Sequence, residues 1–208
     1  YALSVGDAFV KTGSGHVLVI GSEVMSAIMD WADRSTCILF GDGAGAVVLS
    51  PSDGDRGILS TSLHSDGCLA DLICVPGGGS RMPPSEKMLS EGAHYLKMKG
   101  NETYKVAIKT LEDVARETLA ANGLSVEDVD VYIPHQANVR IIRAVAERLK
   151  LPMEKVFLNL DRYGNTSAAS IPLALDEAVR TGRVKHGDVV LLGAFGGGLT
   201  WASALIRW

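Results

Sequence analysis

The chain has 208 residues, 47% of them hydrophobic and 21% charged, and a net charge of -4 at pH 7. This length suffices for one large domain or two small ones with a hydrophobic core. The slightly acidic balance argues against a nucleic-acid-binding platform, and no apolar run is long enough to cross a bilayer. Three scattered cysteines favour the reducing cytoplasm over a disulfide scaffold.

The first half is predicted to be an opening helix followed by short strands and a flap. Apolar residues between positions 2 and 10 fall on one helical stripe, which ends at Gly13. Residues 76–92, rich in Gly, Pro and Ser, are predicted to form a long loop or flap. Short apolar runs predict strands at 16–20, 37–40, 46–49, 58–63, 72–75 and 95–98.

The second half alternates between helices and strands. Helices are predicted at 101–122, 137–149 and 168–181, and strands at 129–133, 156–158, 189–192 and 200–206. This alternation predicts an α/β layered fold with a mixed sheet. We expect two units, with residues 1–93 forming the first and residues 94–208 the second.

The glycine-rich stretch GDGAGA at 41–46 is similar to a dinucleotide-binding fingerprint. That fingerprint has to open a helix, whose N-terminus then meets the pyrophosphate. Here another apolar β run follows, so a tight turn between two strands is the preferred interpretation. Nucleotide binding is therefore not predicted.

Three polar or glycine-rich turns are the candidate functional segments of the sequence. In PHQAN (134–138), His135 lies between a predicted strand and a helix, and a helix N-terminus disfavours imidazolium, so we expect a neutral hydrogen-bond donor. In GNTSAAS (164–170), Asn165 also precedes a helix, where it is either a cap or a site residue. GAFGGG (193–198) has more glycines than a hairpin needs and could present N–H groups to an anion.

Other classes of site are not supported by the spacing. There is no G-x-S-x-G elbow of a serine hydrolase, and the five histidines form no zinc pattern, so no metal site is predicted. The helix after His135 is basic, with Arg140, Arg143 and Arg148 among its residues. This face is either simply solvated or suited to an acidic partner.

The three turns, in this order and together with FGDGAGA (40–46), closely resemble the bacterial β-ketoacyl-acyl-carrier-protein synthase III family along nearly the whole chain. The resemblance implies a thiolase-like fold with α-β-α-β-α layers, of which this chain holds the end of the N-terminal half and the whole C-terminal half. It implies a cytoplasmic homodimeric acyltransferase of fatty-acid synthesis. Such an enzyme condenses acetyl-CoA, or another short acyl-CoA, with malonyl-acyl-carrier protein and needs no cofactor.

The resemblance also implies residue roles. His135 and Asn165 match two members of a Cys-His-Asn triad, and Gly197 matches the oxyanion-hole glycine. Residues that match the coenzyme A channel are Arg34, Gly100, Tyr104, Ala137 and Asn138, with Tyr104 replacing a more usual Phe. Residues that match the carrier-protein contact are Gln136, Ala137, Asn138, Val139 and Arg140.

The nucleophilic cysteine of the triad is not matched by any cysteine of this chain. By the resemblance it should lie about five residues before Tyr1, at a helix N-terminus that lowers its pKa. We therefore expect the chain to be the C-terminal portion of such an enzyme. Two alternatives are a related condensing enzyme with a longer acyl-CoA or another acceptor, and a non-catalytic scaffold that binds coenzyme A or the carrier protein.

Overall fold

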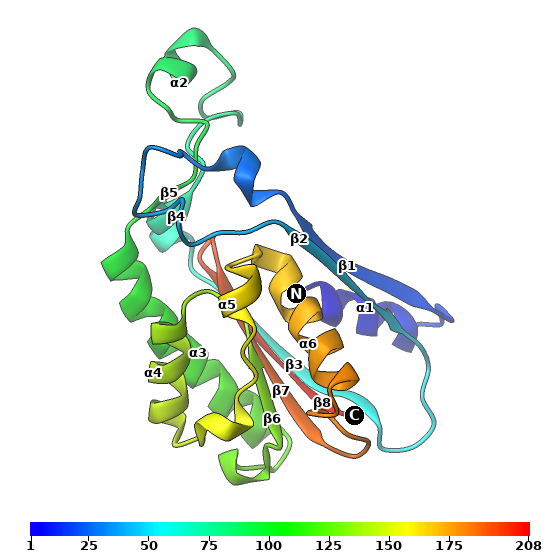
Figure 1. Cartoon of the computed structure of the whole chain (residues 1–208). Helices are drawn as coiled ribbons and strands as arrows, with labels where there is room; N and C mark the ends of the chain where they lie inside the picture. The colour runs from blue at the N-terminus through cyan, green and yellow to red at the C-terminus, as the bar shows by residue number, and fades with distance from the viewer.

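A four-stranded mixed sheet lies at the centre of the computed structural model, which describes residues 1–208 (Figure 1). The order across the sheet is β3 (Gly57–Ser65), β8 (Thr200–Arg207), β7 (Val189–Gly196) and β6 (Val131–Pro134). β6 and β7 are parallel, whereas β8 runs antiparallel to both β7 and β3. The predicted mixed sheet is therefore confirmed, and β3, from the first part of the chain, pairs within it.

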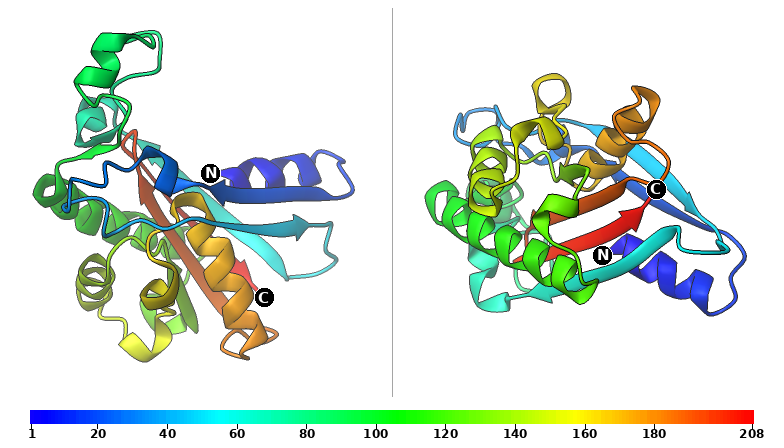
Figure 2. Two further views of the ribbon diagram at one scale, coloured as in Figure 1. Left: turned by 45° about the horizontal axis from the view of Figure 1, so that its top comes forward. Right: turned by 90° about the horizontal axis from the view of Figure 1, so that it is seen from below.

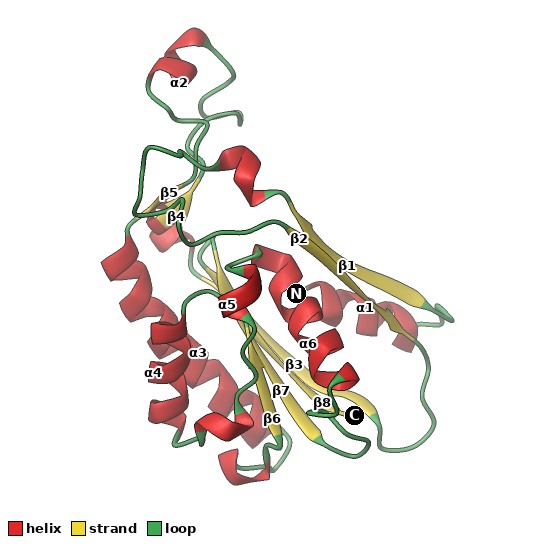
Figure 3. Ribbon diagram, viewed as in Figure 1, coloured by secondary structure: helices red, strands yellow, loops and turns green.

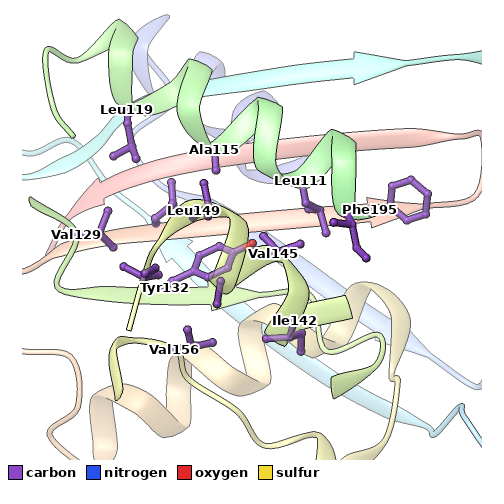
Figure 4. Packing of buried hydrophobic residues seen from close by; sticks show 14 of the residues in the cluster. Leu111, Ala115, Leu119, Val129, Tyr132, Ile142, Val145, Leu149, Val156 and Phe195 are labelled. Atoms are coloured by element: carbon purple, nitrogen blue, oxygen red, sulfur yellow. The ribbon is translucent and has the colours of Figure 1, made fainter. Parts of the chain in front are cut away.

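Helices cover both faces of this sheet (Figures 1 and 3). One face carries α3 (Gly100–Ala121) and α4 (Val139–Leu149), and the other carries α6 (Ser170–Arg180). In β6, Tyr132 packs under α3 and α4, as Figure 4 shows, while Ile133 packs toward α6. Because both faces are buried, β6 and β7 are continuous apolar runs rather than alternating ones.

A second, two-stranded sheet forms a further layer beyond α6. It pairs β1 (Val17–Glu23) with β2 (Gly43–Leu49) in antiparallel register, and α1 (Ala2–Lys11) and α6 pack on one of its faces. The predicted opening helix is confirmed by α1. The outer face of β1 and β2 carries exposed apolar side chains: Leu18 at 60%, Ile20 at 59% and Val48 at 64%.

The stretch at 41–46 is not a turn between two strands. Residues 37–40 do not form the predicted strand, since only Phe40 makes a bridge, with Asn165, and β2 pairs with β1 instead. A Cβ on Gly41 would lie 2.2 Å from the Tyr163 carbonyl oxygen, and one on Gly45 would lie 2.9 Å from Pro172. These glycines therefore let the β2 segment approach the segment that carries Asn165.

The flap is the projection at the top of Figure 1. It lies between two short paired strands, β4 (Ile73–Cys74) and β5 (Lys97–Met98), and contains a short helix, α2 (Glu86–Ser90). This helix was not predicted, although Ser85 caps it by accepting the Met88 N–H. The long loop or flap is otherwise confirmed, as is a return to strand before α3.

Residues 156–158 also differ from prediction: they form no strand, and only Val156 makes a bridge, with Tyr132. The short helix α5 (Leu160–Tyr163) follows them. The 3-10 helices are η1 (Met25–Ile28), η2 (Gly67–Leu72), η3 (Val126–Asp128), η4 (Met153–Lys155) and η5 (Ser167–Ala169). None of the helices is both long and apolar enough to cross a membrane.

Candidate active site

A pocket of about 940 Å³ brings the three predicted turns together. His135 follows β6, and Gly197 follows β7. Because these strands are parallel, their carboxyl ends meet at the same edge of the sheet, where functional groups of α/β proteins gather. The His135 N–H donates to the Gly193 carbonyl oxygen at 2.7 Å, which joins the two strand ends directly. Asn165, between α5 and α6, lines the same pocket.

The backbone of Asn165 is held by the first part of the chain. Its N–H donates to the Leu39 carbonyl oxygen, and its own carbonyl accepts the Gly41 N–H, both at 2.9 Å. This pairing requires the close approach that Gly41 permits. The right-hand part of Figure 2 shows the blue first-half strands crossing behind the yellow segment that precedes α6.

The side chain of Asn165 is oriented by the next turn. Its Oδ1 accepts the Ser167 N–H at 2.9 Å, and the Ser167 hydroxyl donates to Glu23 Oε1 at 3.2 Å. Ser167 adopts φ 50°, a conformation uncommon for a residue with a side chain. With Oδ1 engaged, the Asn165 Nδ2 group is the part of the amide available to a ligand.

His135 is held as a neutral imidazole. Burial lowers its pKa to about 4, so the ring is uncharged at neutral pH. Nδ1 lies 2.6 Å from the Ser170 hydroxyl, and Nε2 has no hydrogen-bond partner in the protein. The direction of this pKa shift agrees with the predicted neutral imidazole, and its cause is burial.

The glycines between β7 and β8 are required by the backbone. Gly198 adopts φ +140°, which side-chain-bearing residues rarely adopt, and a Cβ on Gly197 would lie 3.2 Å from the Ile73 carbonyl oxygen. The connection is therefore a tight one in which the backbone at Gly197 itself lines the pocket. An N–H at such a position can approach a substrate oxygen closely.

Most of the residues matched to the coenzyme A channel line this pocket. Gly100, Tyr104, Ala137 and Asn138 do so, whereas exposed Arg34 does not, although its neighbour Ser35 does. Arg140, matched to the carrier-protein contact, also lines the pocket. The Arg140 guanidinium lies 5.4 Å from the centre of the Tyr104 ring, in cation–π geometry. The Asn138 side chain caps α4 by accepting the Arg140 N–H at 2.8 Å.

Gln136 does not face the pocket or the solvent. It is 1% exposed, and its amide nitrogen donates to the Pro134 and Phe157 carbonyl oxygens at 2.8 and 3.3 Å. Its Oε1 accepts the Asn159 N–H at 3.1 Å. The side chain therefore ties the His135 turn to the loop before α5. Val139, in the first turn of α4, is exposed and outside the pocket.

The chain's three cysteines are not coupled to the His135 and Asn165 side chains. Cys74 lines the pocket from β4, Cys37 lies near the Trp31 carbonyl oxygen, and Cys68 is exposed. None of them hydrogen-bonds to either side chain. The structure also contains no group of three His, Cys, Asp or Glu residues that could hold a metal ion.

Three polar residues around the pocket were missed by sequence reasoning: Ser167, Ser170 and Glu23. Both serines lie inside GNTSAAS, so the motif contained them, but nothing in its spacing showed that Ser170 meets His135. Glu23 ends β1, far away in sequence, and no sequence signal connects it with Ser167.

Two family models match the chain. Residues 1–67 match 3-oxoacyl-(acyl-carrier-protein) synthase III, and residues 119–208 match the C-terminal part of the same synthase. The β-ketoacyl-(acyl-carrier-protein) synthase III of Xanthomonas campestris pathovar campestris is 58% identical over 209 residues, and that of Alkalilimnicola ehrlichii is 56% identical. The chain belongs to the synthase III family.

The fold comparison agrees with this family assignment. The crystal structure of 3-oxoacyl-(acyl-carrier-protein) synthase III from Aquifex aeolicus superposes with a TM-score of 0.91 at 49% sequence identity. The comparison covers 100% of this chain and 63% of the Aquifex chain. The thiolase-like fold is therefore shared. All of this chain is likewise matched in the two bacterial relatives, of which it spans 63% and 64%.

Proposed function

We propose that the chain carries the decarboxylation site of an enzyme that starts fatty-acid synthesis. This enzyme condenses acetyl-CoA, or another short acyl-CoA, with malonyl-acyl-carrier protein. The observation that carries the proposal is the pair of neutral donors in one pocket, His135 Nε2 and Asn165 Nδ2, each with its other polar atom already engaged. The family of the chain supports the same activity.

The chemistry follows from where charge develops. When the bond between the malonyl α-carbon and its carboxylate breaks, CO2 leaves and the electron pair moves onto the thioester oxygen as an enolate. His135 and Asn165 donate to that oxygen and stabilise the charge as it forms. A lysine in their place would attract the departing carboxylate instead, so neutral donors suit the reaction better.

The carbon–carbon bond forms in the second step. The enolate carbon attacks the carbonyl carbon of an acyl group held as a cysteine thioester, and the cysteine leaves as thiolate. We propose that Gly197 N–H donates to the oxyanion formed when the acyl group is transferred. The nucleophilic cysteine is not one of Cys37, Cys68 and Cys74, so it comes from sequence outside this chain.

The substrates are proposed to reach the pocket past Tyr104 and Arg140. Gly100, Ala137 and Asn138 line the same pocket, and exposed Arg34 is proposed to extend the channel for coenzyme A. The exposed basic side chains of α4, with Arg140 foremost and Val139 beside it, form the proposed contact with the acidic carrier protein. Gln136 supports this surface from beneath.

The remaining expectations concern the whole protein. We propose a cytoplasmic homodimer that uses coenzyme A thioesters as substrates and needs no cofactor. The edge of β2 opposite β1 has no strand partner, and an open strand edge can pair with a second copy. Sedimentation equilibrium tests the dimer.

We retain the two-unit organisation as a proposal, with β3 assigned to the second unit because it pairs with β8.

The decarboxylation proposal is tested on the 208-residue chain with malonyl-acyl-carrier protein. Mass spectrometry of the carrier should show conversion of malonyl to acetyl groups. His135→Asn and Asn165→Ala should each lower the rate about 100- to 1000-fold, because each removes one donor to the enolate oxygen. His186→Asn, a change at an exposed histidine, is the matched control. Carrier binding without any decarboxylation would support the scaffold alternative and overturn the proposal.

Acetyl-CoA provides the test of where the nucleophile lies. After incubation, peptide mapping should find no acetyl group on Cys37, Cys68 or Cys74. A stable thioester on Cys74, the one cysteine that lines the pocket, would place the nucleophile inside this chain. That result would contradict the assignment of the nucleophile while leaving the two donors in place.

A further inference from the structure

The hydroxyl of Ser170 lies against the ring of His135 on the side away from the free nitrogen. Ser170 is the first residue of α6 and is 2% exposed. Its Oγ lies 2.6 Å from His135 Nδ1 and accepts the Gln136 N–H at 3.3 Å. The serine therefore has two polar neighbours, and one of them can only donate.

The count of donors and acceptors decides which way the proton lies between Ser170 and His135. The Gln136 N–H uses one lone pair of the serine oxygen. If Nδ1 also carried a hydrogen, it would use the other lone pair, and the serine O–H would have no acceptor, because Nδ1 is its only acceptor within hydrogen-bond distance. A buried donor without a partner is costly. The satisfied arrangement has Ser170 donating to an unprotonated Nδ1.

We propose that Ser170 is a positioning residue that holds His135 in the tautomer with its hydrogen on Nε2. Its consequence for catalysis rests on the proposed function: only this tautomer presents an N–H, rather than a lone pair, to the enolate oxygen. Ser170 is 2% exposed, and its hydroxyl is engaged by His135 and Gln136. In this proposal it acts through the ring of His135 and not on the reacting atoms.

The direct test is nitrogen-15 NMR of the 208-residue chain with labelled histidine at neutral pH. The chemical shifts of the two ring nitrogens report which one carries the hydrogen, and the His135 signals are assigned by their loss in His135→Asn. The wild-type chain should show the hydrogen on Nε2. A hydrogen on Nδ1 in the wild type would overturn the proposal, and this measurement needs no variant of Ser170.

Variants then test whether Ser170 is the cause. Ser170→Ala should shift the ratio of the two tautomers about 5- to 150-fold toward Nδ1–H, the equivalent of about 1–3 kcal/mol for an unsatisfied buried donor. Ser170→Thr keeps the hydroxyl and should restore the wild-type ratio. Ser203→Ala is the matched control, since Ser203 is also buried but its hydroxyl has no partner. An unchanged ratio in Ser170→Ala would refute the role of Ser170.

The tautomer and the reaction are separable. A chain with hydrogen on Nε2 that does not decarboxylate malonyl-acyl-carrier protein would leave the role of Ser170 intact and overturn the proposed function. A chain that decarboxylates the malonyl group with hydrogen on Nδ1 would overturn the role of Ser170 and leave the proposed function intact. In Ser170→Ala, kcat should fall and KM should stay unchanged, because the substrate contacts themselves are not altered.

Discussion

Acidification should destabilise the fold through His135. Burial lowers the pKa of this side chain from 6.5 to about 4, so between these values the unfolded chain binds a proton that the folded chain does not. The stabilisation is complete above about pH 6.5 and is lost as the pH falls toward 4. At about 1.4 kcal/mol per unit, the loss by pH 4 is about 3 kcal/mol.

Urea unfolding at about pH 7 and about pH 4 measures this loss. The comparison is with His135→Asn, which does not titrate there and can still accept the Ser170 hydrogen bond through its amide oxygen. Wild type should lose about 3 kcal/mol more than the variant. Carboxylates such as Asp42, whose pKa is lowered by hydrogen bonds from Ser26, titrate in both proteins and cancel in the difference. Equal losses in the two proteins would refute a neutral, desolvated His135.

Three further changes have defined outcomes. Gly41→Ala places a Cβ 2.2 Å from a backbone carbonyl oxygen and should lower the free energy of unfolding by about 1–3 kcal/mol in urea titrations, whereas Gly15→Ala, with open space around it, should change it little. Tyr132→Phe removes a buried hydroxyl without a partner, so thermal unfolding should show unchanged or slightly higher stability, within about 1 kcal/mol. Arg140→Ala should weaken carrier-protein binding in calorimetry, and more so at low salt, while Arg180→Ala on α6 should not.

The order of strands and helices in the second half was predictable because both faces of the central strands are buried. The apolar runs predicted as strands therefore lie within β7 and β8, and the apolar stripe at helical spacing coincides with α3. The same reasoning failed at residues 37–40 and 156–158. There, Phe40 packs beside a small methionine-containing cluster and Phe157 fills the core under α6, from irregular backbone. An apolar run that fills a core from a loop has the same hydrophobic pattern as a buried strand, so the sequence does not distinguish the two.

The motif residues of the candidate site were predictable from the sequence, but the residues that orient them were not. His135, Asn165 and Gly197 lie in turns whose composition is unusual, and parallel strand ends bring two of the turns together. The contacts that orient them come from Glu23, with no motif around it, and from Ser170, which lies inside a motif but 35 residues away in sequence from its partner His135. Pairings between distant segments leave no local pattern to recognise.

For the proposed reaction, these supports fix the two donors in place before a substrate binds. The Asn165 oxygen is engaged by the Ser167 N–H, and His135 Nδ1 is engaged by Ser170, so each side chain has only its other polar atom directed to a ligand. Donors fixed before the reaction do not spend free energy on reorienting as charge develops. Because β1 anchors Ser167 through Glu23 and α6 carries Ser170, the first and second parts of the chain jointly determine the geometry of the pocket. Replacing Glu23 should therefore disturb Asn165 and leave the tautomer of His135 unchanged.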